Sequence, residues 1–173
     1  MGEPLVNGTA TPLHGTAAGG TVVSVLVEIG VRRAVGVPDS QLAGVLAAVS
    51  RRLPVTFAAR EDVAVAMAVG AGLAGEHFAV FMKNAGLGTS LDAIISLAAG
   101  AEVPLTLVVG WAGAGSDTLP HHVVMGCRTV PLLTAAGVGH DIVGPDGGDA
   151  SRLLAGSAAA RAARRPYALL VEP

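Results

Sequence analysis

The sequence has little of what several protein classes require. Its 173 residues contain one cysteine, Cys127, which excludes a disulfide framework and a cysteine-based zinc site. Aromatic residues make up 3% of the chain, charged residues make up 14%, and the net charge is −2. Nucleic-acid binders present a basic stripe to phosphates, whereas this chain has only short arginine groups, so we expect no nucleic-acid partner.

Long apolar runs are also missing. No stretch reaches the roughly 18 apolar residues that would span a bilayer, and no basic region followed by an apolar one stands at the N-terminus. These absences predict no membrane partner and a cytoplasmic location. Hydrophobic residues still make up 51% of the chain. We therefore expect large surfaces to be buried against other chains.

What is present is an alternation of short apolar segments with helical patterns. The length fits one domain, with residues 1–20 as a mobile tail and residues 21–173 as the folded unit. Strands are predicted at 33–37, 53–59, 78–82, 105–109, 138–143 and 167–171. Helices are predicted at 21–30, 41–52, 60–75, 89–97, 122–136 and 149–164. This alternation predicts an α/β fold, a doubly wound and mostly parallel sheet with helices on both faces.

The predicted helix 60–75 begins with an acid pair and ends in glycines. Glu61 would lie in its first turn, where the helix dipole favours negative charge, at a strand-to-helix edge that binds ligands in open α/β sheets. The residues alone leave two interpretations, a cofactor-tuning acid or a capping acid without chemistry. The glycines of 70–75 fit GxGxxG, but a strand follows them instead of a helix. We therefore expect these glycines to end a helix and permit close packing, with no dinucleotide site.

Polar residues follow each of the first four predicted strands. Asp39 and Ser40 stand in the turn after the first strand, Glu61 follows the second, the loop 83–88 follows the third, and the pair His121–His122 follows the fourth. Singly, each has a structural explanation as a cap, a turn or a surface residue. Because the carboxyl ends of parallel strands share one edge of a sheet, we expect these residues to gather there.

The order of several motifs resembles a known domain. GVPDS is followed by an acid heading an Ala/Gly-rich helix, then by KNAGLG, VPLTLVVGW and PHH. Over residues 21–143 this order is similar to the pyrimidine-binding domain of thiamine-diphosphate-dependent 2-oxoacid decarboxylases, in the phosphonopyruvate and sulfopyruvate branch. The resemblance implies the thiamine-diphosphate-binding fold and a lyase that removes CO₂ from a small 2-oxoacid, with phosphonopyruvate as the first expectation. Sulfopyruvate decarboxylase and another thiamine-dependent acyl-transfer subunit are the alternatives.

The resemblance also implies roles for individual residues. Glu61 would hydrogen-bond N1′ of the cofactor's aminopyrimidine. Asp39, with Ser40 beside it, would line the substrate side, and His121 and His122 would assist proton delivery after CO₂ leaves. The loop near the pyrimidine corresponds to Asn84, Gly86, Leu87 and Gly88.

Three positions depart from the resemblance on the substrate side. Trp111 would contact the substrate, but Ala112 follows it where the phosphonopyruvate branch usually has arginine. Lys83 stands where a glutamine is usual and would supply a compensating charge. The segment 117–122, DTLPHH, also differs from the usual pattern. These departures bear on the substrate more than on the cofactor.

The motif that would hold the diphosphate and Mg²⁺ is missing. In the resembling enzymes a GDG motif with a later asparagine holds them on a second domain, whereas residues 147–150 read GGDA. The resemblance thus implies an α subunit, without metal ligands, whose β subunit carries the diphosphate-binding domain in a hetero-oligomer such as α2β2 or larger. A non-catalytic regulatory subunit is less favoured because Glu61 is retained, and a Rossmann-type nucleotide enzyme is less favoured because no helix follows Gly75.

Overall fold

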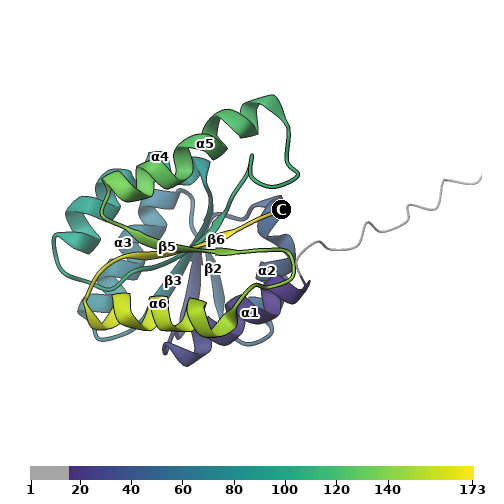
Figure 1. Ribbon diagram of the computed structural model, residues 1–173. Helices are drawn as coiled ribbons and strands as arrows, with labels where there is room; N and C mark the ends of the chain where they lie inside the picture. Colours follow the sequence, from purple (N-terminus) through teal and green to yellow (C-terminus); the bar gives the residue numbers. More distant parts are fainter. Residues whose placement is uncertain (1–15) are drawn as a thin grey trace, which may run out of the picture.

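A six-stranded sheet forms the centre of the molecule (Figure 1). The computed structural model describes residues 16–173, so residues 1–15 of the predicted tail lie outside the described residues. The strands are β1 (Arg33–Gly36), β2 (Val55–Phe57), β3 (Phe78–Lys83), β4 (Thr106–Gly110), β5 (Gly139–Val143) and β6 (Tyr167–Val171). Their order is β2-β1-β3-β4-β6-β5, and each neighbouring pair is parallel.

Helices cover both faces of this sheet (Figure 1). One face carries α1 (Thr16–Glu28), α2 (Ala43–Ser50) and α6 (Ala150–Ala162), with the short 3-10 helix η1 (Ser40–Leu42) before α2. The other face carries α3 (Glu61–Leu73), α4 (Ala85–Asp92), the π-helix η2 (Ala93–Ala99) and α5 (Pro120–Ala135). The predicted doubly wound α/β fold is confirmed. Among residues 16–173, no helix combines the length and the apolar character needed to cross a membrane.

Two apolar cores result, one on each face. Successive side chains of a strand point to opposite faces, so Val80 and Met82 of β3 enter the core under α3, while Ala79 and Phe81 enter the core under α1. The central strand β4 is buried at all of its positions. A strand covered on both faces needs a continuous apolar run, and that is the pattern by which the sequence reveals it.

The N-terminal helix begins earlier than its pattern predicts. Residues 16–20, which we assigned to the tail, form the first turn of α1. Ala18 is fully buried there, and a Cβ on Gly19 would lie 3.0 Å from Ala48 Cβ and from the Gly44 carbonyl oxygen. The small residues that look like a mobile tail therefore permit close contact between α1 and α2.

Two glycine-containing segments differ in how well they were predicted. As expected, the glycines of 70–75 end a helix: α3 stops at Leu73, and Gly75 has a φ of +86°. The predicted loop 83–88 is wrong, because α4 starts at Ala85 immediately after β3. Thr89 therefore lies inside a helix and does not cap it, since the N-cap position belongs to Asn84.

Candidate active site

The predicted site residues follow strands whose carboxyl ends share one edge of the sheet. β1 has β2 on one side and β3 on the other, so the chain reverses its direction of winding at β1. Such a switch point opens a crevice at the carboxyl edge of a parallel sheet. Asp39 follows β1, Glu61 follows β2, and Lys83 ends β3. The topology thus brings segments that are distant in sequence to one edge.

Glu61 is the first residue of α3 and is half-buried. Its side chain lies over the first turn of α4, where a Cβ added to Gly86 would come within 2.5 Å of Glu61 Cγ and 3.0 Å of its Oε1. None of the hydrogen bonds found among residues 16–173 involves the Glu61 carboxylate. Glycine at position 86 therefore provides the space in which this carboxylate lies, and its oxygens remain available for a ligand.

The neighbouring acid, Asp62, makes the local contacts that a structural acid would make. Its carboxylate accepts hydrogen bonds from Arg60 at 3.0 and 3.1 Å and from the Val63 N–H at 2.9 Å. The hydrogen bond from Arg60 holds the pKa of Asp62 below its usual value. At the start of α3, the Asp62 carboxylate therefore accepts the local hydrogen bonds, and the Glu61 carboxylate accepts none of them. This division favours the ligand-binding interpretation of Glu61.

A second cluster surrounds His122 in the first turn of α5. Its Nδ1 lies 2.6 Å from Asp117 Oδ2, and its Nε2 lies 2.9 Å from Lys83 Nζ. Gln41 donates to the same Asp117 oxygen at 2.9 Å, and the His121 ring lies against the His122 ring at a centroid distance of 4.3 Å. The structure therefore brings Lys83 and His122 together, as their shared edge predicted.

Asp117 is the fixed negative charge of this cluster. Its side chain is 9% exposed, and it accepts hydrogen bonds from the backbone N–H groups of Gly113 and Leu119 at 3.0 and 3.3 Å. The Gly113 N–H is the main cause that lowers the pKa of Asp117 to about 2, with Leu119, His122 and Gln41 contributing further. The carboxylate is therefore ionised throughout the neutral range.

The loop that holds Asp117 packs closely on the start of α5. Gly113 has a φ of +80°, and a Cβ there would lie 2.2 Å from the His122 carbonyl oxygen. A Cβ on Gly126 would in turn lie 2.6 Å from the Gly113 carbonyl oxygen. Both close approaches require glycine, and they fix the distance between Asp117 and His122.

Two polar oxygens near this cluster have no partner among the described residues. Asp39 Oδ2 is buried without a hydrogen bond, and a Cβ on Gly110 would lie 3.0 Å from it. Gln41 Oε1 is likewise buried and unpartnered. Buried polar atoms are ordinarily hydrogen-bonded, so these two oxygens lack the partner that burial usually requires. Ser40, predicted beside Asp39, is exposed at the start of η1.

Several other predicted residues have side chains already engaged inside the chain. Asn84 is fully buried and donates to the Ala112 carbonyl and to Thr129 Oγ1, each at 2.9 Å, while its own Oδ1 has no partner. The indole N–H of Trp111 donates to the Gly126 carbonyl at 3.0 Å. Leu87 belongs to the core under α3, whereas Gly88 is exposed. For Asn84 and Trp111, these contacts tie β3 and the loop after β4 to α5.

Sequence reasoning missed two residues of the site. The sequence marks Asp117 only as part of a segment that departs from the usual pattern, and it predicts Gln41 at the start of a helix without a role. The available signal was the spacing of Asp117 and His122 within one loop and helix start, because an acid shortly before a histidine can orient its ring. Gln41 left no such signal, since it reaches Asp117 only through the tertiary fold.

Comparisons with known proteins identify the family of this chain. Residues 17–130 match the family described as thiamine pyrophosphate enzyme, N-terminal TPP binding domain. Sulfopyruvate decarboxylase subunit alpha from Methanothermobacter thermautotrophicus is 33% identical over 61% of this chain and 66% of its own length. Phosphonopyruvate decarboxylase from Streptomyces viridochromogenes is 31% identical over 87% of this chain and 39% of its own length.

A solved structure supports the fold. It is 2-oxoglutarate:ferredoxin oxidoreductase from Magnetococcus marinus, with a TM-score of 0.63, 16% identity, and coverage of 90% of this chain and 28% of that one. The curated relatives are longer than the match: the chain covers between 32% and 68% of the four sulfopyruvate decarboxylase sequences. The family match spans more than half of the chain, and the chain therefore belongs to the thiamine pyrophosphate enzymes and contains their N-terminal TPP binding domain.

Proposed function

We propose that this chain is the α subunit of a split thiamine-diphosphate-dependent 2-oxoacid decarboxylase. The observation that carries the proposal is the half-buried Glu61 carboxylate, which lies against Gly86 at the carboxyl edge of the sheet and has no partner within residues 16–173. A regulatory subunit has no need for such an acid. A capping acid would show contacts like those of Asp62.

The residues present fit the pyrimidine half of the cofactor. A carboxyl group held against a glycine can exchange a hydrogen bond with a ring nitrogen, and the buried Asn84 Oδ1 beside α4 is a free acceptor. Thiamine diphosphate, when bound, supplies an electron sink for the loss of CO₂. The contribution of Glu61 is to hold the cofactor's ring nitrogen and to share a proton with it.

The remaining site residues act on the substrate side. Asp39 and Gln41 have buried oxygens that can accept hydrogen bonds. Lys83 and His122, which lie in contact, would deliver a proton after CO₂ leaves. Ala112 is buried, so the position where the phosphonopyruvate branch usually has arginine offers no reaching side chain. Ser40 and Trp111 border the same edge, where Trp111 offers ring surface because its N–H is engaged.

A partner chain would complete the active site. Three relatives are named as alpha subunits, and the GGDA segment does not supply the expected diphosphate motif. Large apolar side chains are exposed on α3, which Glu61 begins, and on the adjoining η2: Val63, Met67, Leu73, Ile95 and Leu97. Exposed apolar side chains on two adjoining elements fit a docking site. The β subunit would dock there, hold Mg²⁺ and the diphosphate, and form a hetero-oligomer such as α2β2.

The substrate proposed first is phosphonopyruvate, which would yield phosphonoacetaldehyde and CO₂. Sulfopyruvate is the second candidate, because the split relatives are sulfopyruvate decarboxylase alpha subunits. Both substrates are 2-oxoacids with an anionic head group. They differ in the charge of that group, so a site with few cations discriminates between them weakly.

The test is to co-express this chain with the reading frame adjacent to its gene. CO₂ release is then assayed with thiamine diphosphate, Mg²⁺ and each of the two 2-oxoacids. CO₂ release should require both chains, and the isolated chain should bind the cofactor poorly and show no turnover. Tight cofactor binding by the chain alone would refute the split-enzyme proposal. A complex that binds cofactor but decarboxylates neither acid would refute the substrate assignment.

A further inference from the structure

The contacts of His122 define where its ring hydrogen lies. A lysine ammonium has three N–H donors and no acceptor, so at 2.9 Å from Lys83 Nζ the His122 Nε2 must be the accepting nitrogen. The hydrogen of the neutral ring is then on Nδ1, from which it is donated to Asp117 at 2.6 Å. The chain thus holds Lys83, His122 and Asp117 in one line of hydrogen bonds.

This line can hold its mobile proton in two places. In one state Lys83 is an ammonium and His122 is neutral, while in the other Lys83 is a neutral amine and His122 is an imidazolium. The Asp117 carboxylate stabilises the imidazolium, and Gln41 and the Gly113 N–H keep that carboxylate in position. Only the proton between Nζ and Nε2 moves, and no electrons are exchanged.

We propose that Lys83 and His122 form a proton-sharing pair that donates the proton of this site, with Asp117 and Gln41 as its positioning residues. The inference rests on the proposed decarboxylase function and assigns Lys83 a different role from an anion contact. On donation, the shared proton leaves Nζ for a basic centre of the bound ligand, and Lys83 becomes a neutral amine beside a neutral His122. A proton from solvent then restores the pair.

The charged and polar groups near the Lys83–His122 pair come from several elements. Asp117 faces the ring from the loop after β4, and His121 lies against it from α5. Asp39 lies after β1 and Gln41 within η1 at the same edge. With Lys83 charged and Asp117 ionised, the line is neutral overall, and loss of the shared proton leaves one negative charge.

Ring-nitrogen NMR of the full chain labelled with [¹⁵N]histidine tests the pair without cofactor or substrate. Signals of His122 are assigned by their loss in His122→Gln. The expected pattern at neutral pH is an N–H at Nδ1 and a bare Nε2. His77 provides an internal reference of the opposite type, because Arg161 Nε donates to its Nδ1 at 3.1 Å. A neutral His122 ring with its hydrogen on Nε2 would overturn the proposal.

Kinetics of the reconstituted complex separate proton donation from anion binding. Lys83→Met should lower kcat about 100-fold, as expected for loss of a general acid, with little change in KM, and Lys83→Arg should not restore it because arginine does not release its proton. A raised KM with unchanged kcat, or restored activity with arginine, would identify Lys83 as an anion contact. Asp117→Asn should lower kcat less and leave KM unchanged, whereas an unchanged kcat would remove Asp117 from this role.

The turnover assay and the NMR experiment test the two proposals separately. If neither 2-oxoacid is turned over by the wild-type complex, the decarboxylase proposal fails, while the NMR pattern still shows whether the pair exists. If turnover occurs and His122 has its hydrogen on Nε2, the pair fails and the decarboxylase function stands.

Discussion

The two edges of the sheet use histidine in opposite ways. At the carboxyl edge, the His122 side chain is 15% exposed and lies between an ammonium and a carboxylate. At the amino edge, His77 is 6% exposed, and its Nε2 lies 3.1 Å from the Thr106 hydroxyl. Because Arg161 can only donate to Nδ1, the His77 hydrogen is on Nε2 and the Ile29 carbonyl at 3.4 Å is a close neighbour that receives no hydrogen bond.

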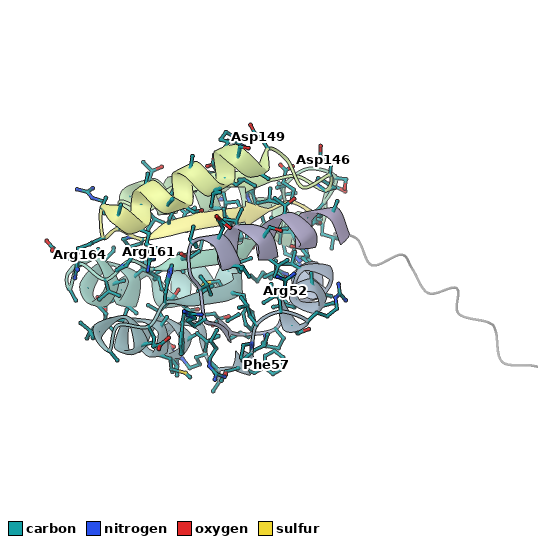
Figure 2. The ribbon with its side chains drawn as sticks, turned by 90° about the horizontal axis from the view of Figure 1, so that it is seen from below. Arg52, Phe57, Asp146, Asp149, Arg161 and Arg164 are labelled. Carbon is teal, nitrogen blue, oxygen red and sulfur yellow. The ribbon has the colours of Figure 1, made fainter. Side chains whose placement is uncertain are left out.

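The environment of each ring determines what it can do. Burial lowers the pKa of His77, and the positive charge of Arg161 lowers it further. A ring that stays neutral in this way ties β3 to β4 and to the C-terminal end of α6. Arg161 lies in the last turn of α6 and Arg164 just beyond it, at the opposite end from Asp146 and Asp149 (Figure 2). His122 lies between Lys83 and Asp117, and the proposed proton sharing rests on this arrangement. Burial beside a fixed positive charge marks His77 as the structural histidine.

The largest expected effect lies at the carboxyl edge. Glu61→Gln in the complete enzyme should slow exchange of the cofactor's C2 hydrogen on the order of 1,000-fold, because an amide cannot share a proton with the ring nitrogen. Exchange is followed by NMR in deuterated buffer. Glu76→Gln, an exposed acid at the amino edge, is the matched control and should change nothing. Normal exchange in Glu61→Gln would remove this acid from the mechanism.

A smaller effect comes from moving Glu61 without changing it. Gly86→Ala places a Cβ 2.5 Å from Glu61 Cγ, and the displaced carboxylate should lower kcat about 100-fold. Gly88→Ala meets nothing within 4 Å and should keep activity while stabilising α4 by up to about 1 kcal/mol. Equal activities of the two variants would show that Glu61 does not depend on Gly86.

Asn84 tests whether a buried polar residue at the carboxyl edge is structural, as His77 is at the other edge. Asn84→Ala removes two hydrogen bonds from a fully buried position, so the free energy of unfolding should fall by about 2 kcal/mol. Denaturation in urea measures it. Thr89→Ala should cost less than about 0.5 kcal/mol, because Thr89 is exposed inside α4. A loss of about 1 kcal/mol there would restore Thr89 as a cap.

The smallest effect is the pH dependence that His77 gives to stability. Its folded-state pKa is lowered from 6.5, so below that pH the unfolded chain takes up a proton that the folded chain refuses. The contribution of His77 to the free energy of unfolding is therefore complete above pH 6.5, and it is lost as pH falls toward the folded-state pKa. Urea midpoints at about pH 7.5 and about pH 5.5 should differ less in His77→Gln than in the wild type. An equal difference would contradict the assignment.

The fold was predictable because its central strands are covered on both faces. Continuous apolar runs marked β3, β4 and β6, and β6 has the bounds that its pattern predicts. Boundaries that depend on small residues were not predictable. The first turn of α1 looked like a tail because its alanines and glycines contact α2, and α4 looked like a loop because glycine signals turns as readily as close packing.

The site was predictable in part, and the limit is physical. Strand order puts Asp39, Glu61, Lys83 and His122 at one edge, which periodicity and the rule for parallel sheets could indicate. The partners of His122 depend on side chains that meet across the fold, and Gln41 reaches Asp117 from a distant segment. Whether Asn84 and Trp111 face a ligand also depends on such contacts, which a linear pattern does not encode.

The contact between Glu61 and Gly86 has a consequence for reading homologous sequences. Under the role proposed for Glu61, an acid at position 61 needs a position 86 without a side chain, so the two positions would be constrained jointly. A homologue that keeps the acid but has alanine at 86 would then be expected to keep the fold and lose the proposed activity.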